Sequence, residues 1–114
     1  MKALVAASQH WLNGDTIREA LVSLPISSTI VISDRTGGDT LVAKIAEEEL
    51  ALKVEKIGVT DENFKSQLVK IIAEHEVDTC YFFTLGTHES EYALSRVSRA
   101  SKIPTETIVE SFGA

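Results

Sequence analysis

The sequence predicts an α/β protein in which helices cover both faces of a mainly parallel, five-stranded sheet. Short apolar or β-branched runs alternate with segments of helical periodicity, and this alternation extends along the chain. Right-handed crossovers join such strands, and the commonest arrangement gives the strand order 3-2-1-4-5. The expected architecture is a three-layer α/β/α fold of the Rossmann-like type, in a single domain spanning residues 1–114.

Five segments have the composition of strands. The first is continuously apolar, the second is β-branched, and the fourth is apolar in succession, as expected of a strand covered on both faces. The third alternates between apolar and polar residues, and the fifth follows Pro104. In order, the expected strands are residues 3–7, 29–33, 53–59, 79–84 and 105–109.

Helical spacing of apolar residues fills the intervals between these strands. The first helix is predicted at residues 15–24 and the second at residues 39–50. The third opens at Thr60 or Asp61, either of which can cap it. The fourth is predicted at residues 90–101.

The composition excludes some classes of partner. The formal net charge is −6, with no basic stripe to offset it, so no nucleic acid partner is expected. No apolar run approaches the roughly 20 residues of a membrane span, and the N-terminal apolar run is shorter than the roughly 7–15 residues of a secretion signal. The lone Cys80 cannot form an internal disulfide. We expect a cytoplasmic protein without membrane association, with Cys80 as a buried and inert thiol.

The expected topology also indicates where a ligand would bind. Ligands of open parallel sheets bind outside the carboxyl ends of the strands, where the strand order reverses. Here that point lies between the first and fourth strands, which selects residues 8–11 and 85–89, with residues 34–39 beside them. We therefore expect the working surface at the loops after the first, second and fourth strands.

Two glycine-containing turns lie in these loops. Gly37, Gly38 and Asp39 join the second strand to its helix, and Gly86 and Thr87 follow the fourth strand. Glycine allows close approach of the backbone, helix N-terminal amides favour anions, and the threonine hydroxyl can hold a phosphate or ribose oxygen. The alternative is purely structural: a tight turn with Asp39 as the helix cap, and a second turn with Thr87 or Ser90 as the cap.

His88, Glu89 and Glu91 form the cluster best suited to proton transfer. A carboxylate here acts as a general acid or base if burial raises its pKa. The alternative is an acidic first turn that complements the helix dipole. The histidines, His10 and His75 among them, show no metal-ligand spacing, so neither a metal nor any other cofactor is expected.

Two aromatic features each have alternative readings. Trp11 follows the first strand, where its ring either stacks on a base or ring of a ligand or covers the first helix in the core. The run Tyr81-Phe82-Phe83 is explained as part of the core, and the alternative is that it contributes to a homodimer.

Three motifs occur in a characteristic order. They are Leu-Val-Ala-Ala-Ser-Gln-His-Trp at residues 4–11, Gly-Gly-Asp-Thr-Leu-Val-Ala at residues 37–43 and Phe-Thr-Leu-Gly-Thr at residues 83–87. Together they resemble the YspA-like branch of the SLOG superfamily, which also includes Lonely-guy and DprA-type domains. The resemblance extends over almost the whole chain. It implies a Rossmann-like domain that binds a nucleotide or a nucleotide-derived ligand.

Two positions depart from the family pattern. Gln9 stands where the first loop usually has an arginine, which would supply a bidentate phosphate contact. Ser33 and Asp34 replace the early glycine region of the second loop. The resemblance and the loop positions together give a candidate ligand site made of Ser8, Gln9, Trp11, Asp34, Gly37, Gly38, Asp39, Gly86 and Thr87.

Three functions are therefore considered. The leading one is binding of a nucleotide or nucleotide-derived small molecule at the carboxyl edge of the sheet. The second is a nucleotide-processing hydrolase like the Lonely-guy branch, which cleaves the N-glycosidic bond, with Glu91 or Glu89 as the acid or base. The third is a regulatory or structural interaction protein with a decayed pocket, which the departures at Gln9, Ser33 and Asp34 favour over the enzyme.

Overall fold

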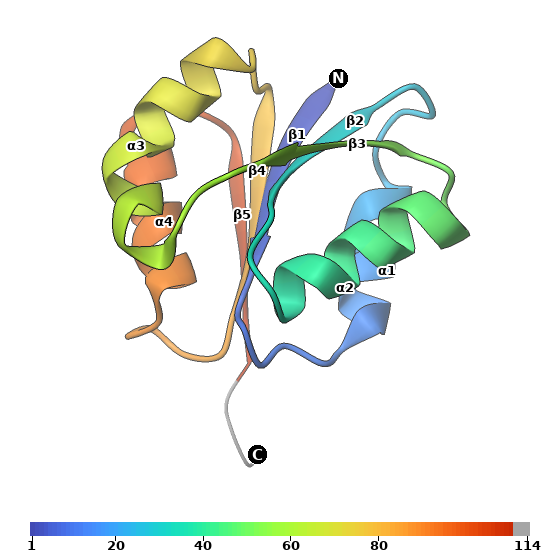
Figure 1. Cartoon of the computed structure of the whole chain (residues 1–114), viewed down its shortest axis with the longest axis horizontal. Coiled ribbons are helices and arrows are strands. Elements are labelled where there is room, and N and C mark those ends of the chain that lie inside the picture. The colour runs from blue at the N-terminus through green and yellow to red at the C-terminus, as the bar shows by residue number, and fades with distance from the viewer. Residues whose placement is uncertain (111–114) are drawn as a thin grey trace.

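The five predicted strands form one parallel sheet in the predicted order (Figure 1). The structure, a computed structural model, describes residues 1–110, the side chain of residue 61 excepted. The sheet order is β3-β2-β1-β4-β5, and every neighbouring pair is parallel. The strands are β1 (Lys2–Ala7), β2 (Thr29–Ser33), β3 (Lys53–Ile57), β4 (Thr79–Thr84) and β5 (Thr105–Val109). The Rossmann-like fold class expected from the sequence is confirmed.

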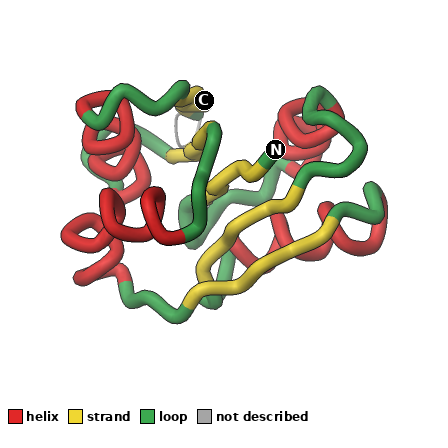
Figure 2. The backbone as a smooth tube through the Cα atoms, turned by 90° about the horizontal axis from the view of Figure 1, so that it is seen from above, coloured by secondary structure: helices red, strands yellow, loops and turns green. Residues whose placement is uncertain are grey.

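Helices cover both faces of the sheet (Figures 1 and 2). Helices α1 (Gly14–Val22) and α2 (Gly38–Lys44) lie on one face, and α3 (Asp61–Glu74) and α4 (Ser90–Ala100) lie on the other. A short π-helix, η1 (Ile45–Glu49), continues α2. None of the helices within the described residues is both long and apolar enough to cross a membrane.

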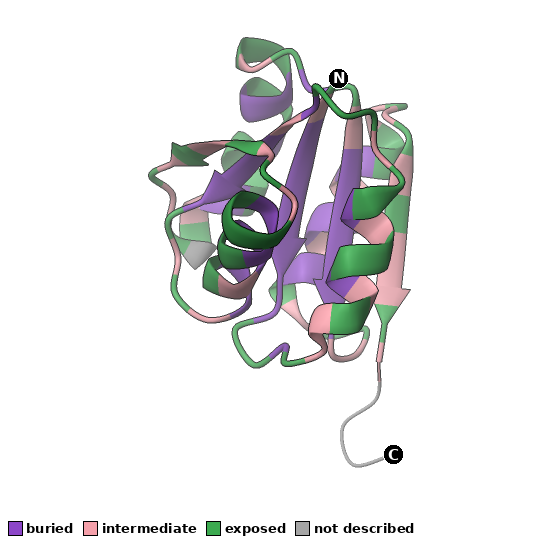
Figure 3. Ribbon diagram, turned by 90° about the vertical axis from the view of Figure 1, so that its right-hand side faces the viewer, coloured by how far each residue is buried: buried purple, intermediate pink, exposed green. Residues whose placement is uncertain are grey.

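The central strand β1 supplies both cores, one on each face of the sheet. Ala3, Val5 and Ala7 pack into the core shared with α1 and α2. Leu4 and Ala6 point the other way, into the core shared with α3 and α4. Successive side chains of a strand face opposite sides, so a strand covered twice has to be apolar at every position. Figure 3 shows this: buried strands fill the middle, and the helices are exposed on their outer faces.

The second helix differs from its prediction as one uninterrupted helix over residues 39–50. The α-helical part ends at Lys44, and one wider π-turn follows, in which the Leu50 amide donates to the Ile45 carbonyl at 3.2 Å. The Leu52 amide then reaches the Ala46 carbonyl at 2.8 Å. This turn keeps Ile45 and Ala46 in the core while the acidic residues after them are exposed. Helical periodicity alone does not reveal the extra residue in the turn.

Two of the predicted helix caps are wrong and one is confirmed. Thr60 caps α3, and its hydroxyl and the Asn63 side chain form a reciprocal capping box. Gly37, not Asp39, is the N-cap of α2, because the Asp39 carboxylate is engaged inside the protein. At α4 the N-cap is Glu89, without a side-chain cap, so neither Thr87 nor Ser90 has that role.

Candidate functional site

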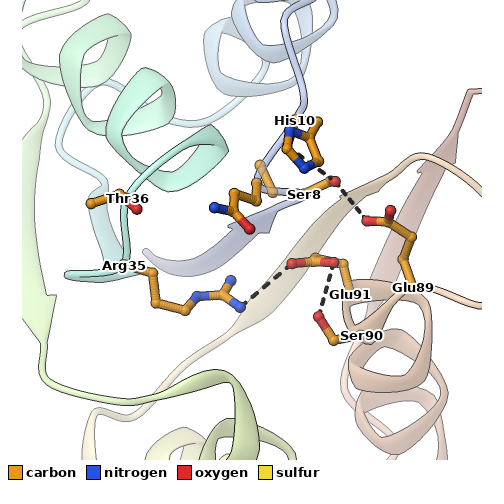
Figure 4. A pocket seen from close by; sticks show the side chains of 9 residues that line it. Ser8, His10, Arg35, Thr36, Glu89, Ser90 and Glu91 are labelled. Atoms are coloured by element: carbon orange, nitrogen blue, oxygen red, sulfur yellow. Dashed lines mark hydrogen bonds and ion pairs between the residues drawn. The ribbon is translucent and has the colours of Figure 1, made fainter.

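A polar pocket opens at the carboxyl ends of β1 and β2, facing the start of α4 (Figure 4). Its volume is about 360 Å³. It lies at the edge of the sheet where the sequence places the working surface. The lining residues are Ala7, Ser8, Gln9, His10, Arg35, Thr36, Glu89, Ser90 and Glu91. Of the predicted ligand residues, Ser8 and Gln9 line it, and so do both predicted acid–base candidates, Glu89 and Glu91.

Gly37 and Gly38 bring the start of α2 against the loop that follows β1. A Cβ atom on Gly38 would lie 2.8 Å from the Cβ of Ala7, and one on Gly37 would lie 2.8 Å from the Cα of Gln9. Gly37 also has a φ of 87°, a conformation that favours glycine. The close backbone approach expected at these glycines is therefore made to the protein's own first loop. Neither glycine lines the pocket.

Asp39 is a buried junction between the ends of β1 and β2. Its side chain accepts the Ala7 amide at 2.8 Å, the Ser33 hydroxyl, and the Nε–H of Arg35 at 2.9 Å. Burial raises the pKa of Asp39, and the Arg35 charge and these hydrogen bonds act against that rise. Asp39 therefore holds Arg35 in place from beneath and is not itself a pocket-lining group.

Arg35 supplies the pocket with a guanidinium group held on several sides. Its Nη2 lies 2.8 Å from the Asp39 carboxylate, and its Nη1 lies 3.4 Å from Oε1 of Glu91. The group also lies 4.9 Å from the centre of the Phe64 ring, a cation–π contact. Only 11% of the Arg35 side chain is exposed. A fixed guanidinium of this kind is suited to binding carboxylate or phosphate.

Arg35 was not among the residues predicted for the site. Gln9 leaves the first loop without a cation, and Arg35 brings one to the same pocket from the neighbouring loop. A signal was present, because Arg35 lies two residues after the end of β2, in a loop already selected. What the sequence does not contain is the meeting of Arg35 with Glu91, 56 positions away.

Glu91 meets the condition set for proton transfer, because it is buried at the pocket wall. Its side chain is 4% exposed. Burial raises its pKa and nearby Glu89 adds to the rise, while its own backbone amide, Arg35 and the Ser90 hydroxyl act in the opposite direction. Ser90 donates to Oε2 of Glu91 at 3.1 Å. A carboxyl with a raised pKa can hold a proton closer to neutral pH than an exposed one.

A hydrogen bond between Ser8 and Glu89 connects the loop after β1 with the loop after β4 across the pocket. The Ser8 hydroxyl donates to Oε2 of Glu89 at 2.6 Å, and the His10 amide approaches the Ser8 hydroxyl at 3.4 Å. The Ser8 amide also donates to the Phe83 carbonyl at 2.8 Å, which continues the pairing of β1 with β4. Hydroxyl and carboxylate groups therefore face the pocket opposite Arg35 (Figure 4).

The other predicted ligand residues lie outside the pocket lining. Trp11 is 1% exposed and packs edge-to-face on Phe83 at 5.4 Å, which settles its alternatives in favour of the core. Asp34 is exposed near Gly58, after the end of β3. Gly86 has a φ of 121° and lies with the exposed Thr87 in the loop before α4. Trp11 therefore does not fill the pocket.

Cys80 and the residue types that bind metal ions are the remaining groups considered in the sequence. Cys80 is buried in β4, and burial raises its pKa to about 11, as expected of an inert thiol. Within the described part of the chain, no three His, Cys, Asp or Glu side chains gather in a way that could hold a metal ion.

The fold and the pocket define a Rossmann-like α/β protein with a charged, polar pocket at the carboxyl edge of its sheet. No protein-family model, curated protein or solved structure matches this chain.

Proposed function

We propose that this protein binds a nucleotide or a nucleotide-derived small molecule in the pocket at the ends of β1 and β2. The observation that carries the proposal is Arg35, a guanidinium fixed by Asp39 and lining a polar pocket at the carboxyl edge of a parallel sheet. Ligands of such sheets bind at this edge. Arginine is the side chain best suited to a phosphate oxygen there.

The contact of Arg35 with Glu91 is looser than its contacts with Asp39. The separation of 3.4 Å is longer than the 2.7–2.9 Å typical of a charge-assisted hydrogen bond. By contrast, the Asp39 contacts to the same guanidinium are 2.8 and 2.9 Å. A ligand phosphate would replace the loose contact with Glu91 and leave the close one with Asp39 intact.

The remaining pocket groups suit the sugar of a nucleotide. Glu89 can accept hydrogen bonds from ribose hydroxyls, and Ser8, Thr36 and Ser90 offer hydroxyl groups. The volume of about 360 Å³ falls within the roughly 300–1,000 Å³ of small-molecule pockets. The resemblance to the YspA-like branch supports the same ligand class, and Arg35 offers a substitute for the cation missing at Gln9.

Calorimetry and thermal shift with AMP, ADP, cyclic AMP and ADP-ribose test the proposal. A ligand at 100 times its Kd should stabilise the protein by about 2.7 kcal/mol. Thr36→Glu adds a negative charge at an exposed pocket position, so we expect it to weaken binding at least ~10-fold. The matched control is Ser66→Glu, exposed on α3 outside the pocket, which should bind like the unaltered protein. No binding of any of the four at millimolar concentration would contradict the proposal.

A second candidate is hydrolysis of the N-glycosidic bond of a nucleotide, favoured by the buried carboxyl of Glu91 in the pocket wall. Glu91 would donate a proton to the departing base while water attacks the sugar carbon, giving free base and ribose phosphate. Incubation with nucleoside monophosphates and chromatography for free base tests this. Base release that Glu91→Gln abolishes would support the enzyme. Base release that Glu91→Gln and Glu89→Gln both leave unchanged would remove the assigned roles.

A further inference from the structure

The position of the Glu91 carboxylate is what distinguishes this pocket. Its Oε1 lies 3.4 Å from Nη1 of Arg35, and its Oε2 accepts the Ser90 hydroxyl at 3.1 Å. Its own backbone amide, in the first turn of α4, also acts on it. A guanidinium, a hydroxyl and a helix N-terminal amide are the groups that usually hold a bound phosphate. Here the Glu91 carboxylate of the protein itself lies where these three groups meet.

We propose that Glu91 is an internal competitor for the anion position of the pocket, and that ligand phosphate displaces it from Arg35 with uptake of one proton. The inference rests on the proposed function and names the residue that sets its affinity and pH dependence. Asp39 and Glu91 already share the Arg35 guanidinium, so a ligand phosphate would be a third negative group on one cation in a nearly buried wall. That arrangement carries a large cost, because burial weakens the solvation of the charges. Protonation of Glu91 removes that conflict.

The surroundings of Glu91 favour this exchange over movement of Arg35. Asp39 holds the guanidinium through Nη2 and Nε, with contacts of 2.8 and 2.9 Å, whereas Glu91 contacts Nη1. Phe64 of α3 lies against its face at 4.9 Å. Glu91 has only the looser contacts already described, so it is the partner that gives way. Its side chain is 4% exposed, so an ionised Glu91 displaced from Arg35 would lose the cationic contact that Arg35 provides while the carboxylate stayed largely buried.

The charged and titratable groups around Glu91 come from each neighbouring element. The segments after β1 and β2 contribute His10, Arg35 and Asp39, and Glu89 precedes Glu91 on its own segment. On α3, which packs against α4, Lys65 lines a separate groove between those two helices. Burial and Glu89 both raise the pKa of Glu91, so the proton needed for the exchange is bound more readily than by an exposed glutamate.

Calorimetry with ADP-ribose and cyclic AMP at pH 5.5–8 tests the inference, because their phosphate charges do not titrate in that range. Titration in two non-phosphate buffers with different ionisation enthalpies measures proton uptake. We expect the unaltered protein to take up a fraction of a proton, at most one, at pH values between the pKa of Glu91 in the free protein and its higher pKa in the complex, and to bind more weakly as pH rises through that interval. Glu91→Gln should bind on the order of tenfold more tightly at pH 8, with little pH dependence. Glu48→Gln, which removes an exposed carboxylate on η1, is the charge-matched control and should keep the proton uptake.

Each outcome decides something different. Binding without proton uptake, together with Glu91→Gln that is no tighter, overturns the inference and leaves the proposed function standing. Absence of binding in both proteins overturns the proposed function and the inference with it. A carbon-13 NMR titration of the Glu91 carboxyl needs no variant: saturating ADP-ribose should raise its pKa, and an unchanged or lowered pKa would overturn the inference.

Discussion

At the residue scale, the pocket depends on buried charges that compensate one another. Asp39 joins the Ala7 amide, the Ser33 hydroxyl and the Arg35 guanidinium, and Arg35 in turn reaches Glu91. Buried charged groups of this kind stabilise a fold only when each has its partners. Removing one member therefore affects the others, and this makes the network testable by substitution.

Asp39→Ala should destabilise the protein by about 3–5 kcal/mol, because it leaves the Arg35 charge and the Ala7 amide without their buried acceptor. Urea unfolding at neutral pH measures the change. Asp15→Ala is the matched control: the Asp15 side chain is 89% exposed and paired with Arg18, so about 0.5 kcal/mol or less is expected. Equal effects of the two substitutions would contradict the assigned role of Asp39.

Glu91→Gln should raise stability relative to the unaltered protein as pH increases. Burial raises the pKa of Glu91 in the folded protein above its ordinary value of 4.5. Between these two pKa values the folded state binds more protons than the unfolded chain, so stability falls as pH rises through that interval. Glutamine cannot ionise and avoids this loss.

The measurement is the free energy of unfolding of Glu91→Gln minus that of the unaltered protein, from pH 4 to 8. The difference should grow in favour of glutamine as pH rises through the interval and then level off. Glu48→Gln, exposed on η1, gives the baseline for removing one negative charge. A difference that shrinks with rising pH would mean that Glu91 is stabilised in its ionised form.

At the scale of the elements, most of the fold could be predicted because the determining forces are local. The strands β2, β4 and β5 have the bounds expected from their apolar and β-branched runs. Other boundaries differ from the prediction by one or two residues, as at α1, which ends at Val22 instead of residue 24. The π-turn of η1 keeps Ile45 and Ala46 buried, and β3 ends at Ile57 instead of residue 59.

The pocket was less predictable than the elements that form it. Glycine after a strand signals close approach of the backbone but not what is approached, and Gly37 and Gly38 approach the protein's own first loop. Asp39 was predicted to contact a ligand, with a helix cap as the alternative, but tertiary partners take its carboxylate. Residues such as Arg35 and Glu91, far apart in sequence, meet only once the sheet order is set.

Gly38→Ala tests the contact between α2 and the loop after β1. The added Cβ would lie 2.8 Å from the Cβ of Ala7, with backbone close by, so the helix or the loop has to shift. We expect a loss of stability of about 2 kcal/mol or more in urea unfolding. Gly58→Ala is the control, because its Cβ would meet only the Asp34 carboxylate at 3.7 Å and should change stability by less than about 1 kcal/mol. Similar losses at both glycines would contradict the assigned contact.

At the scale of the whole molecule, two cores share the central strands of one sheet. Trp11 and Phe83 belong to the core on the side of α1 and α2, and Cys80 and Phe82 belong to the core on the side of α3 and α4. Strand β4 contributes side chains to both cores and pairs with β1, so losing either core removes packing from strands that the other core also needs. The two faces should therefore unfold as one cooperative unit.

Trp11 and Cys80 report on one core each, and this makes the expected cooperativity measurable. Trp11 is 1% exposed, and the Cys80 thiol is buried with its pKa raised to about 11, so a thiol reagent at pH 8 should not modify the native protein. In increasing urea, Trp11 fluorescence and rapid modification of Cys80 should give the same midpoint, as two-state unfolding requires. If Cys80 became reactive while the Trp11 fluorescence was still native, the α3–α4 side would open separately, and the shared strands would not couple the two cores.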